Sequence, residues 1–221
     1  MSGTSTREAL VEQGALLFAR HGVGGVTVRQ LHEAVGARNE SALQYHFGGR
    51  GGLVAEIVRR HLEAIEARRA RLVAVLAAED RAGDLRGLVH ALAAPMADDL
   101  GEPVGRAHLR LVDQLSHPSL AYRRPFRVVD APAGTAVVRW LNDALAHLPD
   151  GVRVERLVVL RGQLVALFAM RAQLLDEAPG SEMAAGNALF VENLLDMLVA
   201  GLAAPASPAT EAAAAAWEHC D

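Results

Sequence analysis

The 221-residue sequence contains no lysine, a single cysteine and few aromatic residues. All 22 basic residues are arginines, and we give the absence of lysine no functional weight. The one cysteine, Cys220, lies next to the C-terminus and excludes an internal disulfide framework. Aromatic residues make up 4% of the chain and hydrophobic residues 51%, which predicts a sizeable core built mainly from leucine, valine and alanine.

Long apolar runs are also missing. Residues 1–6 are polar and no signal-peptide-like apolar region follows them, so nothing indicates export. The longest apolar run, 157–170, contains Arg161 and Gln163 and is shorter than the roughly 18 residues that indicate a membrane span. We therefore expect a cytoplasmic protein without membrane association.

The net charge of −4 is unevenly distributed along the chain. Residues 1–71 carry a balance of +3, whereas residues 72–221 carry −7. A basic N-terminal part is compatible with nucleic-acid binding, although solvated helix faces often show a surplus of this size.

The stretch 27–53 has the spacing of a helix-turn-helix. Thr27 can cap a helix over 28–35 by accepting from backbone N–H groups of its first turn. Gly36 can end that helix because it tolerates the left-handed conformation. The helix is expected to bury one stripe, formed by Val28, Leu31 and Val35.

A second short helix, about 40–47, follows a turn at 37–39. Leu43 and Phe47 lie four residues apart and are expected to face inward. The remaining faces carry small and hydrogen-bonding side chains, which suit the major groove, where glutamine can bind adenine and an alanine methyl can meet thymine. Spacing alone leaves open a second interpretation, a short surface helix in any α-helical domain.

The rest of the chain also has helical periodicity, so the sequence predicts an all-α protein. Proline and glycine separate the segments after residue 79. The tail 205–221 is rich in alanine and proline, and we expect it to be disordered. The predicted helices are 6–21, 53–78, 85–100, 103–116, 132–148, 152–177 and 181–203.

Several motifs occur in a fixed order. Phe18 is followed at the fourth position by Gly22, and Thr27 by Leu31 and Gly36. The run Tyr45-His46-Phe47 is then followed by Arg50 and Leu53. Over residues 7–53 this order resembles the DNA-binding domain of the tetracycline-repressor (TetR) family of bacterial transcription regulators. The chain departs from the family pattern by Arg50 in place of lysine, His32 in place of alanine, Gln44 in place of an aromatic residue, and one extra residue between Gly36 and Phe47.

The resemblance implies a fold and a division into domains. An N-terminal three-helix helix-turn-helix domain would occupy 1–53 and continue through a linking helix, 53–78. A larger helical domain for effector binding and dimerisation would occupy 79–204, and the tail 205–221 would follow it.

The resemblance also implies roles in binding double-stranded DNA. Phosphate contacts, which fix register without reading sequence, are assigned to Thr27, Tyr45, His46 and Arg50. The candidates for reading base edges are Arg38, Asn39, Ser41, Ala42 and Gln44. A capping or core histidine is the alternative for His46, and a plain helix cap is the alternative for Thr27.

The last two predicted helices are apolar on more than one face, which indicates a partner for the face that the core leaves uncovered. In the family that the chain resembles, the corresponding helices form a four-helix dimer interface. A two-fold homodimer would place its recognition helices about 34–36 Å apart, one turn of DNA. An internal hairpin is the alternative. The interface candidates are Leu157, Leu160, Leu164, Leu167, Phe190, Leu194 and Leu198.

The family also implies an effector pocket in the second domain, suited to a largely apolar small molecule with one or two polar groups. Each lining candidate has ordinary core packing as its alternative. The histidines lack metal-ligand spacing, and His108 with Asp113 makes no convincing catalytic triad, so we expect no metal, no cofactor and no enzyme. The pocket candidates are Met96, His108, Leu111, Gln114, Arg127, Trp140, Phe168 and Met170.

The sequence thus favours a homodimeric transcriptional repressor that a small effector releases from a palindromic operator. Two alternatives stay open: a helical ligand-binding protein or enzyme that keeps the fold without regulating transcription, and a purely structural helical dimer. The motifs between Phe18 and Leu53 favour the first.

Overall fold

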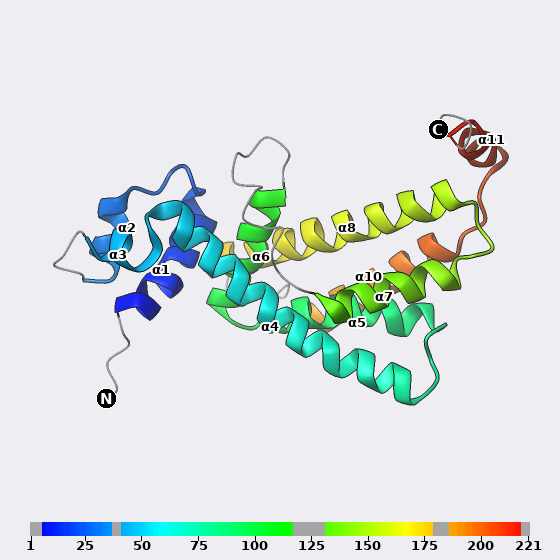
Figure 1. Ribbon diagram of the computed structural model, residues 1–221, viewed down its shortest axis with the longest axis horizontal. Helices are drawn as coiled ribbons and strands as arrows, with labels where there is room; N and C mark the ends of the chain where they lie inside the picture. The colour runs from blue at the N-terminus through cyan, green and yellow to red at the C-terminus, as the bar shows by residue number, and fades with distance from the viewer. Residues whose placement is uncertain (1–5, 37–40, 117–130, 179–185, 218–221) are drawn as a thin grey trace. The chain divides into compact units, whose positions relative to one another are not determined.

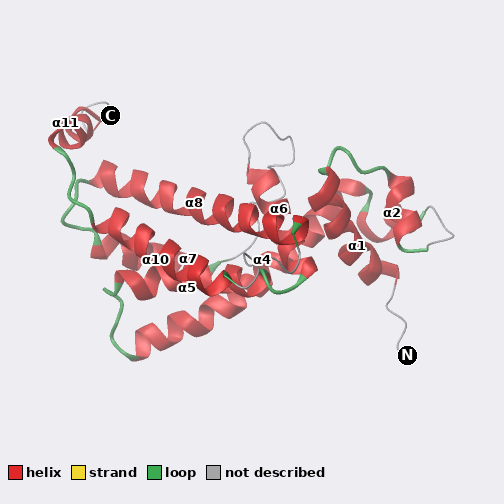
Figure 2. Cartoon of the chain, turned by 180° about the vertical axis from the view of Figure 1, so that it is seen from behind, coloured by secondary structure: helices red, strands yellow, loops and turns green. Residues whose placement is uncertain are grey.

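The computed structural model describes residues 6–36, 41–116, 131–178 and 186–217. All regular secondary structure in these ranges is α-helical and none of it is strand (Figure 1, Figure 2). The predicted all-α fold class is therefore confirmed. Three predicted site residues lie outside the described ranges, namely Arg38, Asn39 and Arg127.

The chain divides into two compact units, each made of segments that are distant in sequence. Unit 1 comprises Met1–Ile65, Asp98–Asp130 and Phe168–Pro179. Unit 2 comprises Glu66–Ala97, Ala131–Leu167 and Gly180–Asp221. The division falls inside the predicted linking helix, between Ile65 and Glu66.

Unit 1 holds the predicted helix-turn-helix. Its helices are α1 (Thr6–His21), α2 (Val28–Ala34), α3 (Ala42–Phe47), the first part of α4 (Arg50–Ala78) and α6 (Pro103–Ser116), together with the last part of α8 (Asp150–Glu177), from Phe168 onward. Their core contains Phe18, Leu31, Leu43 and Leu53, all at most 2% exposed. Leu111 of α6 belongs to the same core, so a helix from beyond residue 79 completes the packing of the N-terminal helices.

Gly14 allows α1 and α4 to approach closely. A Cβ atom at this position would lie 3.0 Å from Cδ2 of Leu53 and 3.3 Å from Cδ1 of Ile57. Both leucine and isoleucine are fully buried, so they have little room to move aside. The buried side of α1 therefore uses Gly14 as a contact surface.

The buried face of α2 differs from the predicted stripe. Leu31 is fully buried as expected, but Val28 is 45% exposed, and His32 is buried instead. Val28 is the first residue of α2 and directly follows the N-cap residue Thr27. The position of the core relative to a helix of only seven residues decides which of its faces is covered.

The beginning of α4 also differs from prediction. The sequence predicts that this helix begins at residue 53, after the glycine-rich run 48–52. Only Gly48 and Gly49 have the left-handed φ values, 67° and 110°, and α4 begins at Arg50. Gly51 and Gly52 are helical because two residues suffice for the turn.

Unit 2 is built from the remainder of α4, most of α5 (Leu85–Asp99), α7 (Pro132–Ala144), α8 as far as Leu167, α10 (Asn187–Ala203) and α11 (Pro208–Trp217). Within it, the carboxylate of Glu66 accepts hydrogen bonds from the backbone N–H groups of Ala133 and Gly134, at 2.5 and 3.1 Å. A negative charge at a helix N-terminus is favourable. Glu66 therefore anchors the start of α7 to α4.

The prediction of a disordered tail is wrong for residues 208–217, which form α11. The hydroxyl of Ser207 accepts from the backbone N–H of Thr210 at 3.2 Å and so caps the helix. Alanines dominate this segment, and alanine has the highest helix propensity. The alanine-rich composition from which disorder was predicted is thus also typical of a helix.

Helix α8 is long and apolar enough, by length and composition, to cross a membrane, and α10 with α11 would pass the same test as one bent span. The core helix of a soluble helical protein has the same length and composition. Leu160, Leu164 and Phe168 of α8 are at most 4% exposed in the folded chain.

Candidate nucleic-acid interface

Thr27 begins α2 through a reciprocal cap. Its hydroxyl accepts from the backbone N–H of Gln30 at 3.2 Å, and its own N–H donates to Oε1 of Gln30 at 2.8 Å. This capping box gives hydrogen-bond partners to two backbone N–H groups that would otherwise have none within the helix. The capping alternative for Thr27 is therefore present, while its side chain remains exposed at the edge of the unit.

Helix α3 has one buried and one exposed side. Leu43 is 2% exposed and anchors the helix in the core. Tyr45 is 84% exposed, and Ser41 and Gln44 are exposed as well. The helix ends at Gly48, whose N–H donates to the carbonyl oxygen of Gln44 at 2.9 Å. The exposed side thus presents hydroxyl and amide groups, which suit hydrogen bonding to base edges and phosphates.

His46 and Ala42 are half-buried at the sides of α3. The ring of His46 lies edge-on to Tyr45, with centroids 5.0 Å apart, and to Phe47, at 6.1 Å. These contacts hold the imidazole between its two neighbours. Because Tyr45 projects further than His46, it is the aromatic residue better placed to reach a ligand.

Arg50 has a contact that the sequence did not predict. Its Nη1 donates to the backbone carbonyl oxygens of Val26, at 2.6 Å, and Val23, at 3.3 Å. Both carbonyls belong to the segment between α1 and α2. Arg50 therefore ties the start of α4 to that segment, in addition to any role at a phosphate.

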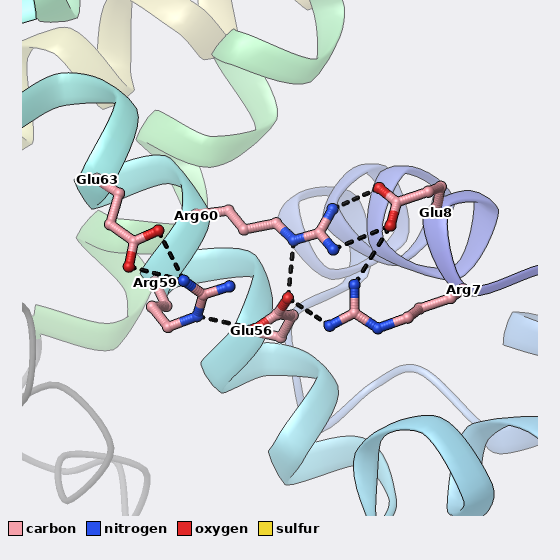
Figure 3. A network of polar contacts seen from close by, with 6 residues as sticks. All are labelled: Arg7, Glu8, Glu56, Arg59, Arg60 and Glu63. Atoms are coloured by element: carbon pink, nitrogen blue, oxygen red, sulfur yellow. Dashed lines mark hydrogen bonds and ion pairs between the residues drawn. The ribbon is translucent and has the colours of Figure 1, made fainter. Parts of the chain in front are cut away.

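An ion-pair network joins α1 to α4 on the same unit (Figure 3). Glu56 accepts from Arg7 at 2.7 Å, from Arg60 at 2.8 Å and from Arg59 at 2.9 Å. Hydrogen bonding from Arg59, then from Arg60 and Arg7, lowers the pKa of Glu56 from 4.5 to about 2 despite partial burial. Sequence reasoning missed Arg7, since no local motif links residues 49 positions apart.

Unit 1 also contains two neighbouring histidines, of which His61 is buried and His108 is half-buried. The rings of His61 in α4 and His108 in α6 have centroids 4.7 Å apart, and Nδ1 of His61 lies 3.4 Å from Oδ2 of Asp99. Burial lowers the pKa of His108 from 6.5 to about 4. No group of three potential ligands positioned for a metal ion occurs among the residues described.

The predicted effector-pocket residues are spread over several environments. Leu111 and Phe168 are fully buried, and Leu111 packs in the core with α1. The amide of Gln114 donates to the carbonyl oxygen of Ala19 at 3.0 Å, whereas Met170 is 51% exposed. Met96 and Trp140 belong to unit 2 and are half-buried. Core packing therefore explains the position of Leu111, and a hydrogen bond within the unit explains the position of Gln114.

A hollow of about 530 Å³ lies elsewhere, between α8, α10 and α11 of unit 2. None of the predicted pocket residues lines it. Glu155 and Gln163 are among its polar residues, and its wall is mainly apolar. The apolar wall includes Val154, Val159, Leu160, Met197, Leu198 and Trp217.

The predicted interface leucines face mostly inward. The four residues Leu160, Leu164, Leu194 and Leu198 are at most 6% exposed within a single chain, and Leu157, Leu167 and Phe190 are half-buried. The large apolar side chains that α8 and α10 expose in unit 2 are Val154, Val158, Val159, Leu189 and Met197. The four buried leucines are therefore core residues, and other apolar residues form the solvent-exposed faces of α8 and α10.

Similarity to a characterised protein covers part of the chain. Over 56 residues the chain is 38% identical to the HTH-type transcriptional repressor AcnR of Corynebacterium glutamicum. The match spans 25% of this chain and 29% of the length of that repressor. No protein-family model matches the chain. The partial similarity supports a DNA-binding regulator.

Proposed function

We propose that the protein is a TetR-like transcriptional repressor that acts in the cytoplasm as a homodimer on a palindromic operator. The observation that carries this proposal is the short helix α3, anchored by Leu43, with Ser41, Gln44 and Tyr45 exposed. The order of motifs between Phe18 and Leu53 and the partial similarity to a repressor support it.

The side chains of α3 would divide their roles by chemistry. The Tyr45 hydroxyl would donate to a phosphate, and His46 beside it would contribute a second contact. Gln44 would read a base, since its amide can pair with adenine N6 and N7 in the major groove. Thr27, exposed at the start of α2, would add a hydroxyl contact to a phosphate.

Dimerisation would use the exposed apolar residues of α8 and α10. Val154, Val158 and Met197 are 50–65% exposed, and apolar side chains gathered on neighbouring helices favour a protein partner. The two helices are neighbours because Nη1 of Arg156 donates to the carbonyl oxygens of Leu202 and Ala204. A second copy of the chain would cover this face with the same residues.

Release by an effector would follow from a difference in affinity between two conformations. A small apolar molecule that binds better to a dimer with mis-spaced recognition helices would draw the protein from its operator. Helix α6 packs in one core with α1, so a change in α6 would reach the DNA-binding helices directly.

Selection of bound duplexes from a random pool by the purified chain tests the proposal. We expect a palindromic site, with an affinity that falls steeply as salt rises because phosphate contacts release counterions. Tyr45→Ala should weaken binding about tenfold or more on every duplex, since a hydrogen bond to a charged group is lost. Gln44→Ala should instead change the preference at one base position.

Tyr45→Phe is the matched control for the hydroxyl, because it keeps the ring and its packing. The absence of any enriched sequence would contradict the proposal. Equal losses for Tyr45→Ala and Gln44→Ala on all duplexes would contradict the division between phosphate contact and base reading.

A further inference from the structure

One side chain of α1 contacts both the end of α3 and the middle of the first part of α4. The guanidinium carbon of Arg7 lies 5.4 Å from the centroid of the Phe47 ring. Its Nη2 donates to Oε1 of Glu56 at 2.7 Å. Phe47 is the last residue of α3, so Arg7 bridges three helices of unit 1.

Arg7 is itself held in place by a closed ring of ion pairs (Figure 3). Arg60 donates to Glu56 and, through Nη1 and Nη2, to Glu8 at 2.5 and 2.9 Å. Nη1 of Arg7 completes the ring with Glu8 at 3.2 Å. The Glu56 side chain at the centre is only 13% exposed, so salt and water screen it less than they screen a surface pair.

Helix α3 depends on such contacts for its orientation. It has six residues, less than two turns, and a helix of that length is not stable by itself. Leu43 is the residue of α3 that is buried in the core, whereas Phe47 at the end of the helix packs against that core while only partly buried. A second contact at its far end is needed to aim Gln44 and Tyr45 together.

We propose that Arg7 is a positioning residue for recognition of DNA. Its guanidinium, fixed by Glu56, holds the Phe47 ring and so sets the direction of the exposed face of α3. This inference rests on the proposed function, since the direction of α3 matters only if α3 reads DNA. Arg7 itself lies 38% exposed beside α4 and contacts no base in this role.

Hydrogen exchange followed by NMR tests the positioning without DNA. Arg7→Ala should raise the exchange rates of the Tyr45 and Gly48 amides, which bond to Ser41 and Gln44, about tenfold or more. The amide of Leu31, bonded to Thr27 in α2, should keep its rate. Arg59→Ala is the matched control, because Arg59 pairs with Glu56 and Glu63 within α4.

Binding to the selected duplex and to a random duplex then tests the consequence. Arg7→Ala should lower the ratio of the two affinities about tenfold, and Arg59→Ala should leave it within about twofold. Arg7→Lys should give an intermediate ratio, because lysine keeps the charge and loses the planar guanidinium.

Unchanged exchange in α3, or an equal rise throughout unit 1, would overturn the positioning role. A selective wild-type chain whose Arg7→Ala variant keeps the affinity ratio would overturn this inference and leave the proposed function standing. A wild-type chain that selects no duplex would overturn both.

Discussion

Arg50 Nη1 lies 2.6 Å from the backbone carbonyl oxygen of Val26. This bond connects the first residue of α4 to the segment that leads into α2. An arginine for which the family resemblance predicts a phosphate contact therefore supports the backbone of the DNA-binding helices. The two roles make different predictions.

If the structural role dominates, Arg50→Ala should lower the free energy of unfolding by about 1–3 kcal/mol, because a half-buried carbonyl loses a charged donor. Urea denaturation measures this change. Arg50→Lys is the control, since lysine keeps the charge without the planar donor group. Unchanged stability together with a shallower dependence of DNA affinity on salt would assign Arg50 to the phosphate alone.

The half-buried His108 should make stability depend on pH. Its pKa is about 4 in the folded chain and 6.5 ordinarily, so below pH 6.5 the unfolded chain binds a proton that the folded chain does not. Stability should fall as the pH drops from 6.5 toward 4, with a slope of up to about 1.4 kcal/mol per pH unit from this group.

His108→Gln should flatten that slope. Urea titrations between pH 6.5 and 5.5 measure it, above the range in which the unfolded chain, where the Glu56 pKa is 4.5, takes up a proton at that carboxylate. His90→Gln, at an exposed position of α5, controls for the general loss of an imidazole. A His108→Gln slope as steep as the wild-type slope would contradict the assignment.

Charged residues on the exposed face of α8 and α10 should prevent dimerisation. Val158→Glu combined with Met197→Glu should yield a folded monomer by light scattering, because each charge would be desolvated in the interface. Val138→Glu is the control, a valine of similar exposure on α7. A dimer that survives the double substitution would place the interface elsewhere. Leu164→Arg is unsuitable here, because Leu164 is 4% exposed and its replacement tests folding.

Helix α11 offers a spectroscopic test of the C-terminal segment. A Cβ atom at Gly151 would lie 2.9 Å from Cε3 of Trp217, too close for an ordinary contact. In a Trp140→Phe background, Gly151→Ala should shift the Trp217 fluorescence to longer wavelength as the ring moves toward water. Trp217 is already 57% exposed, so stability should change by less than about 1 kcal/mol. An unchanged spectrum would show that the ring does not rest on Gly151.

Capping and turn chemistry made several local features predictable. Thr27 and Gln30 form the cap of α2, Pro103–Ser116 is α6 with the predicted bounds, and α1 ends at His21 before Gly22. Each depends on residues within one or two helical turns, so sequence spacing contains the necessary information. The errors also have local reasons, as at Arg50, where two left-handed glycines make the turn and leave the next residues free to be helical.

The sequence by itself determined the helical class, most helix positions and the exposed polar side of α3. Only the tertiary structure decided which side of α8 and α10 is buried, since helices apolar all round fit a core in several orientations. It alone also brought Arg7 to Phe47 and Glu56, and His61 to His108. The two residues of each pair are separated in sequence by the length of more than ten helical turns, and no repeating sequence pattern links them.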